Sequence, residues 1–454
     1  MAQPRVKAAI VLMLPLWLGL EIATETWVLA PAILALAILL FLVILVRSRN
    51  TFPYLLVLIL GLEQLRVPEL GSWGTASKIG GLAVITVYSL LFLAERRRPR
   101  MVWSETLGLQ IAYVFFMAAS IGWAYSPQPV LTGTSTLILL IVLTLLVLDF
   151  VRTEADVQKF VQALILYAVF LSLYATYELI AKASGTIVSG LRSEAFSGNP
   201  NIAAGYIVMA IGLSLGFATS IQSRKAVSIL SGVLGILVVG LLATGSRGGF
   251  LALMAILLYT SSQVMGRWRQ IVIVVLIGGL LLSLTYLYLP ITFELMASRF
   301  GFGPASGANP TGRRIELWTS ALSLFSDNPL VGVGLSNFET HPDNLTEMNS
   351  HGTYPGLLAQ GGVIGFSLFL SFVVLTVWNL LKMRRKGERT SLLSNAILGG
   401  LLALLAVFVF ADGEDDKMFW LLLALTQALQ VTCAKQAARQ RFWKLVPLGD
   451  PRVT

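Results

Sequence analysis

The chain has only two histidines, His341 and His351, and both lie in one polar stretch that directly precedes a strongly apolar segment. A neutral imidazole is the usual proton acceptor for a hydroxyl near pH 7. Position alone favours a surface histidine in a loop, and His341, which is followed by Pro342, has the context of a turn residue. Whether His351 has a chemical role depends on the residues that surround it in the fold, among which the arginines are candidates.

Arginines occur at three places where glycine or proline interrupts apolar sequence. Arg247 lies in "LLATGSRGGFLAL", Arg192 in "GLRSEAFSGNPNIAAGY", and Arg313 and Arg314 in "GRRIELW". A guanidinium group can bind two phosphate oxygens at once. The alternative for each residue is an arginine that extends to lipid headgroups. We expect Arg192, Arg247 and Arg314 to surround one polar cavity.

Composition places these residues in a membrane protein. The chain has 454 residues, of which 56% are hydrophobic and 12% are charged, and its mean hydropathy is +0.79. Soluble proteins carry roughly a quarter charged residues. The single cysteine, Cys433, cannot form a disulfide within the chain. Nucleotide-binding glycine loops and zinc-binding "HExxH" motifs are not found in the sequence, and we expect no cofactor and no metal.

Apolar runs of membrane-spanning length recur along the whole chain, and the pattern predicts an all-α polytopic protein with about 12–14 transmembrane helices. The predicted spans lie near residues 8–25, 27–46, 52–66, 76–94, 105–123, 131–150, 158–181, 201–219, 226–243, 247–264, 270–289, 355–381, 392–411 and 418–433. The third span is short and has the alternative of a re-entrant segment.

Positive charge predicts the orientation. With the N and C termini in the cytoplasm, all but nine of the 33 Lys and Arg residues fall in cytoplasmic segments. This asymmetry is typical of inner-membrane proteins. The net charge of +10 is then a topological signal and an attraction to anionic lipids, rather than a sign of nucleic-acid binding.

One outer loop is long and holds both histidines. The predicted organisation is residues 1–289 with eleven spans, a periplasmic loop at 290–352, three spans in 353–433, and a cytoplasmic tail at 434–454. Apolar residues between 315 and 325 have helical spacing, so the loop should carry a short amphipathic helix. The acidic run "DGEDDK" at 412–417 is predicted as an outer turn, with the alternative that it positions or repels an anionic acceptor.

Four motifs in the second half of the chain carry a family resemblance. They are "FSGNPNIAAGY", "LLATGSRGGFLAL", "GRRIELWTSALSLFSDNPLVGVGLSNF" and "SHGTYPGLLAQGGVIGF", between residues 190 and 370. In this order, followed by the closing spans, they resemble the superfamily of O-antigen ligases and O-antigen polymerases, which are bacterial polytopic membrane glycosyltransferases. The first six spans resemble only generic membrane helices.

The resemblance implies a metal-independent glycosyl transfer at the periplasmic face of the inner membrane. The donor would be a glycan on undecaprenyl pyrophosphate, and the acceptor a sugar hydroxyl on lipid A-core in a ligase or on another lipid-linked glycan in a polymerase. By the same resemblance, His351 would act on the acceptor hydroxyl, and Arg247, Arg314 and Arg192 would bind the donor pyrophosphate. Arg313 and His341 are secondary candidates.

Two residues depart from the family pattern. Gly352 follows the histidine where the family usually has Asn, and Gln360 stands where it usually has Glu.

A transporter of lipid-linked glycans is an alternative class of function that stays open. Transporters often have internal repeats and ionisable residues in mid-membrane. This sequence has no convincing repeat, and its polar residues cluster toward one face, which favours an enzyme.

Overall fold

The computed structural model describes residues 50–62, 83–88, 103–183, 199–218, 223–263, 310–344 and 348–445, and the single residues 48, 81, 193 and 195. The predicted spans 8–25, 27–46 and 270–289, and most of 76–94, lie outside these residues. The regular elements of the described part are helices: α3 (Phe52–Gly61), α5 (Glu105–Ala119), η2 (Ser120–Gly122), α6 (Pro127–Phe150), α7 (Glu154–Ala183), α8 (Pro200–Ala218), α9 (Arg224–Thr244), α10 (Arg247–Gln263), α13 (Pro310–Asp327), α14 (Thr353–Met383), α15 (Glu388–Val407) and α16 (Lys417–Leu445).

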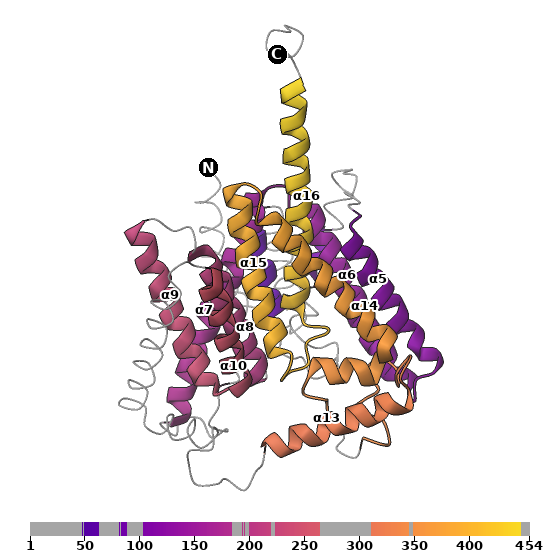
Figure 1. The fold of residues 1–454 in the computed structure, drawn as a ribbon. Coiled ribbons are helices and arrows are strands. Elements are labelled where there is room, and N and C mark those ends of the chain that lie inside the picture. Colours follow the sequence, from indigo (N-terminus) through magenta and orange to yellow (C-terminus); the bar gives the residue numbers. More distant parts are fainter. Residues whose placement is uncertain are drawn as a thin grey trace, which may run out of the picture.

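The predicted fold class is confirmed. Eight helices of the described part are long and apolar enough to cross a membrane, and α3 and α10 are shorter apolar helices. Figure 1 shows these helices side by side in one bundle, with α13 lying across one end of it. The chain is therefore a multi-pass membrane protein, and we refer to the end that carries α13 as the α13 end.

Local sequence explains where several helices begin and end. Ser104 caps α5, because its hydroxyl oxygen accepts a hydrogen bond from the Leu107 N–H at 3.0 Å. Thr153 and Asp156 form a reciprocal cap at the start of α7, in which each side chain accepts from the other's N–H. Gly245 ends α9 in the left-handed conformation, with φ of 57°.

Two helices at the centre of the bundle approach each other through glycines. A Cβ on Gly212 of α8 would lie 2.4 Å from the Gly399 carbonyl oxygen of α15, and a Cβ on Gly216 would lie 2.3 Å from Ala396 Cα. Small residues allow the backbones of membrane helices to come this close, which increases their van der Waals contact. The two helices therefore form the tightly packed centre of the bundle.

The amphipathic helix predicted for the outer loop is present, and it is longer than the predicted stretch. Leu317, Ala321 and Leu324 of α13 are buried, whereas Ile315 and Leu322 are exposed. The buried residues follow helical spacing and face the bundle. α13 lies across one end of the bundle (Figure 1), so it positions side chains beyond the ends of the membrane helices.

A break inside α14 changes the direction of that helix. Gly362 has φ of 57° and ψ of −161°, which interrupts the helical hydrogen bonding. The N–H groups beyond the break find carbonyl partners in the preceding loop: Val363 donates to Pro329 at 2.8 Å and Ile364 to Leu330 at 3.2 Å. The first turns of α14 lie beside α13, and the remainder crosses the bundle (Figure 1).

The same loop satisfies the carbonyl groups before the break. The N–H groups of Val333 and Gly334 donate to the carbonyls of Ala359 and Gln360, each at 2.9 Å. The Gln360 side chain adds a bond, since its Oε1 accepts from the Ser336 N–H at 2.6 Å. Backbone groups within a membrane protein need such internal partners. The motif "NPLVGVGLS" and the motif "LLAQGGVIG" thus form one interlocked structure.

The break predicts the effect of a single methyl group. In Gly362→Ala, the Cβ would lie 2.4 Å from the Leu330 carbonyl carbon, at a φ that alanine rarely adopts. We expect the free energy of unfolding to fall by roughly 1–3 kcal/mol or more, since backbone strain alone has that size. The measurement is thermal unfolding in detergent. Gly235→Ala is the matched control, because nothing lies within 4 Å of a Cβ at Gly235 in α9, and it should unfold at the same temperature or above.

Candidate functional site

His351 lies in a strained turn directly before α14. Its φ is 47°, a value that residues other than glycine rarely adopt. One carboxylate holds the turn: Asp412 Oδ1 accepts from the Ser350 hydroxyl at 2.9 Å and from the Gly352 N–H at 3.2 Å. The other oxygen, Oδ2, lies 3.9 Å from His351 Nδ1. Asp412 therefore both shapes the turn and places negative charge beside the imidazole.

Backbone contacts fix the turn to the end of α15. The Thr353 N–H donates to the carbonyls of Phe408 and Ala411, at 2.9 and 3.1 Å, and its hydroxyl donates to Ala411 at 2.8 Å. About a third of the His351 side chain is exposed. The Asp412 contact is on the Nδ1 side of the ring, so Nε2 lies on the opposite side of the ring from this contact. The 3.9 Å separation is an ion-pair distance and is longer than a hydrogen bond.

Arg247 is the first residue of α10, in a tight turn between two helices. Ser246 makes the turn: its Oγ accepts from the Gly249 N–H at 3.2 Å and donates to Asn201 Oδ1 at 2.9 Å. Asn201 belongs to the "NPN" motif, where its own N–H donates to Asn199 Oδ1 at 2.8 Å. The first and second motifs therefore meet at the side chain of Ser246. The N-terminal position of Arg247 combines its charge with the positive end of the helix dipole.

The two glycines after Arg247 are explained by packing. A Cβ on Gly248 would lie 2.9 Å from Phe410 Cβ, and a Cβ on Gly249 would lie 2.7 Å from Ala204 Cβ. Side chains of the protein occupy the space beside both glycines, so the glycines allow α10 to approach α8 and the loop after α15.

Arg314 reaches the same loop from α13. Its guanidinium carbon lies 5.6 Å from the centre of the Phe410 ring, and Trp318, one turn later, stacks on the same ring at 6.5 Å. Burial lowers the pKa of the Arg314 guanidinium, and the positive charge of Arg247 lowers it further. Arginine stays protonated in proteins. The structure thus brings Arg247 close enough to Arg314 for their charges to interact, with Arg314 against the Phe410 ring.

The other predicted residues have different positions. His341 contacts its own turn, since its Nδ1 lies 3.6 Å from Asp343 Oδ2, and its ring lies 5.7 Å from the ring of Tyr125. Arg313 precedes Arg314 in α13, where the structure describes its backbone only. Arg192 lies outside the described residues. Among the described residues, no group of three His, Cys, Asp or Glu side chains is placed to hold a metal ion.

The acidic turn contributes more to the site than its composition indicates. Asp412 contacts the histidine turn, whereas Asp416 caps α16 by accepting from the Phe419 N–H at 2.8 Å. Glu414 lies between them. Burial raises the pKa of Glu414 to about 8, and the charges of Asp415 and Asp412 contribute to this shift. Near neutral pH, Glu414 is therefore largely protonated and adds little negative charge to the site.

The raised pKa of Glu414 predicts a pH dependence of stability. A carboxyl in the unfolded chain loses its proton near pH 4.5, while the folded protein keeps it up to about pH 8. The folded state therefore binds more protons than the unfolded state between these values, and stability should fall as the pH rises through this window. Thermal unfolding between pH 5 and 9 measures this slope.

Glu414→Gln should flatten that slope, because the amide does not titrate. Glu316→Gln, on the exposed side of α13, is the control and should leave the slope unchanged. An unchanged slope in the Glu414→Gln variant would show that Glu414 is ionised in the folded protein at neutral pH.

Comparison with known protein families gives a match over part of the chain. Residues 232–370 match the family model described as O-antigen ligase. The matched segment contains Arg247, Arg314 and His351, and it covers the second, third and fourth motifs. No curated protein matches the chain significantly. The match confirms, for this segment, the predicted resemblance to the O-antigen ligase-like superfamily.

Proposed function

We propose that the protein transfers a glycan from undecaprenyl pyrophosphate to a sugar hydroxyl at the periplasmic face of the bacterial inner membrane. The family match indicates a membrane glycosyltransferase of the O-antigen ligase and polymerase type. One observation carries the residue assignment: Phe410 contacts Arg314, and Asp412, two residues later, contacts the histidine turn. One short loop thus contacts both a candidate phosphate-binding arginine and the turn that holds the candidate base.

The arginines would stabilise the leaving group. When the bond between the anomeric carbon and the pyrophosphate breaks, negative charge develops on the phosphate oxygens. Fixed guanidinium groups stabilise such charge more strongly in a partly buried site than in water. Arg314 is partly buried, and Arg247 lies close enough to affect its pKa, so both positive charges act on the same region. Arg192 and Arg313 are further candidates for this role.

His351 would activate the acceptor. As the acceptor oxygen attacks the anomeric carbon, its hydroxyl proton passes to Nε2, and the pyrophosphate leaves with the bonding electrons. Asp412, on the Nδ1 side, would stabilise the imidazolium that forms. Direct displacement would invert the configuration of the anomeric carbon. In this mechanism Asp412 is a positioning residue, since it acts on substrate only through the histidine.

The acceptor proposed first is lipid A-core, as in an O-antigen ligase, and the alternative is a second lipid-linked glycan, as in a polymerase. The purified protein can be supplied with lipid-linked glycan, with and without lipid A-core. Product on lipid A supports the ligase, and longer glycans on the carrier support the polymerase. Movement of the intact lipid between leaflets without any transfer would instead identify a transporter.

The charge distribution supports a periplasmic site. The clusters at 95–100 and 382–389 are proposed to face the cytoplasm, and the α13 end the periplasm, because positive loops stay on the cytoplasmic side. Single cysteines introduced at residues 326 and 387, in a variant without Cys433, test the orientation. An impermeant thiol reagent added to cells with a permeabilised outer membrane should label position 326 and spare position 387. The opposite labelling pattern contradicts the proposed orientation.

Loss of the base should slow transfer without releasing the donor. In His351→Ala we expect turnover to fall by about 10²–10⁴-fold, which is typical for removal of a general base, while the affinity for lipid-linked donor stays within a few-fold. Turnover and donor affinity are measured in the same detergent preparation. His341→Ala should remain active, because His341 belongs to a separate turn.

Arg247→Lys is the complementary variant. It keeps the positive charge but loses the two-pronged geometry, so donor binding should weaken along with turnover.

The histidine prediction has its own contradicting outcome. A His341→Ala variant that is inactive beside an active His351→Ala variant would show that the assignment of the base is wrong.

A further inference from the structure

Trp318 connects the two parts of the candidate site. It lies on α13 one turn after Arg314, and the side chains of both residues contact the ring of Phe410. Its indole nitrogen lies against the histidine turn, because a Cβ placed on Gly352 would be 2.9 Å from Trp318 Nε1. One aromatic side chain is therefore next to the candidate phosphate-binding arginine and also next to the residue that follows the candidate base.

The indole N–H of Trp318 is buried and unpaired. Among the residues that the structure describes, no atom accepts a hydrogen bond from Nε1, although the side chain as a whole is partly exposed. An indole nitrogen is a donor only, and a buried donor without an acceptor is unfavourable. Nearly all such groups in folded proteins have a partner. The unpaired N–H therefore suits an oxygen atom of a ligand.

The order of groups in the proposed reaction identifies the part of the ligand. The anomeric carbon lies between the pyrophosphate, at the arginines, and the acceptor hydroxyl, at His351. Trp318 is four residues after Arg314, which corresponds to about 6 Å along α13, and its nitrogen lies at the histidine turn. A donor at this place faces the sugar ring that carries the anomeric carbon, rather than the phosphate or the distant sugars of the glycan.

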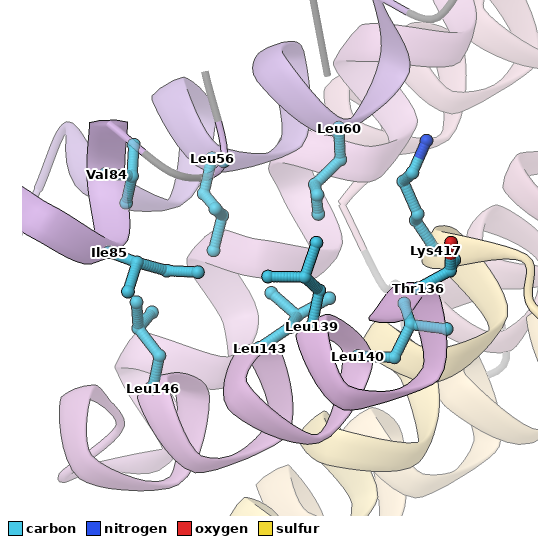
Figure 2. A pocket seen from close by; sticks show the side chains of 11 residues that line it. Leu56, Leu60, Val84, Ile85, Thr136, Leu139, Leu140, Leu143, Leu146 and Lys417 are labelled. Atoms are coloured by element: carbon cyan, nitrogen blue, oxygen red, sulfur yellow. The ribbon is translucent and has the colours of Figure 1, made fainter. Parts of the chain in front are cut away.

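The apolar groove at α3 and α6 offers a sugar no comparable partner. Its walls are α3, residues 81–85 and α6, and leucines of α3 and α6 point toward one another across it (Figure 2). Among its described lining residues, Thr136 and Lys417 are the polar ones, and they lie together at one end. Sugar hydroxyls buried there would lose their hydrogen bonds to water without replacement. The groups that can bind a sugar lie at the α13 end instead.

We propose that Trp318 binds the first sugar of the donor glycan, with its N–H donating to an oxygen beside the anomeric carbon. This inference rests on the proposed function, from which it takes the positions of the pyrophosphate and the acceptor. Since Gly352 lies beside Nε1, the sugar oxygen reaches the N–H after a small movement of the turn, and the hydrogen bond gained favours that movement. Trp318 then determines specificity, because a first sugar without that oxygen leaves the N–H unpaired.

The test compares the affinity for two lipids in the absence of acceptor. One is undecaprenyl pyrophosphate, and the other is the lipid-linked glycan purified from the native host. Trp318→Phe keeps an aromatic ring and removes the N–H. It should bind the lipid-linked glycan about 5- to 50-fold more weakly, the size of one unmade hydrogen bond, and undecaprenyl pyrophosphate as the wild type does. Arg314→Ala should weaken the binding of both lipids, because both carry the pyrophosphate.

Two further variants separate the hydrogen bond from other effects. Trp378→Phe is the matched control, because Trp378 of α14 is 55% exposed and lies outside the site, and it should bind both lipids normally. Replacement of Trp318 by 3-benzothienylalanine keeps the shape of the indole with sulfur in place of the N–H, and it should lose as much affinity for the lipid-linked glycan as Trp318→Phe. Thermal unfolding checks that each variant is folded.

Two results would overturn the proposal. Equal losses of affinity for the two lipids in Trp318→Phe would show that Trp318 acts on the pyrophosphate or on the fold. Full affinity of the benzothienylalanine variant for the lipid-linked glycan would show that the N–H makes no bond to the sugar.

The outcome is separate from that of the proposed function, because binding needs no turnover. A loss of affinity confined to the lipid-linked glycan, in a protein that never transfers it, would support the sugar contact and refute the transferase. Transfer activity with unchanged glycan affinity in both Trp318 variants would refute the sugar contact and leave the transferase in place.

Discussion

The break at Gly362 in α14 leaves backbone groups that need hydrogen-bond partners. The loop that supplies these partners determines the structure at the α13 end. A helix that breaks within a membrane protein leaves N–H and C=O groups that lipid cannot satisfy. Residues 329–334 supply both kinds of partner, on either side of Gly362. Since this loop directly follows α13, that helix is held beside the first turns of α14. The position of Arg314 is a consequence of this pairing.

The short segment after α15 contacts several parts of the candidate site. Phe410 contacts Arg314, Asp412 contacts the histidine turn, and Asp416 caps α16. The segment is acidic in composition, which by itself would repel a pyrophosphate. Its charge is reduced because Glu414 is largely protonated near neutral pH, while the carboxylate of Asp416 caps the N-terminus of α16.

The sequence predicted local elements better than the contacts between them. The turn at Arg247, the amphipathic helix and the start of α14 after His351 follow from apolar periodicity and glycine placement, and the structure shows all three. Asp412 could not be selected in this way for two reasons. It lies 60 residues from Gly352, from whose N–H it accepts a hydrogen bond. In addition, nothing in the sequence distinguishes one carboxylate of an acidic run from the next. The break at Gly362 was equally hidden, since a glycine pair in an apolar run is typical of helix packing as well as of a bend.

The glycine contacts between α8 and α15 have a consequence for lateral access. Where the Gly212 and Gly399 backbones touch, no lipid chain can pass between the two helices. A long-chain lipid that diffuses in the bilayer must reach the interior through other seams, beside the peripheral helices. The close contact of α8 and α15 therefore limits the routes by which a lipid can enter the bundle to the seams between the other helices.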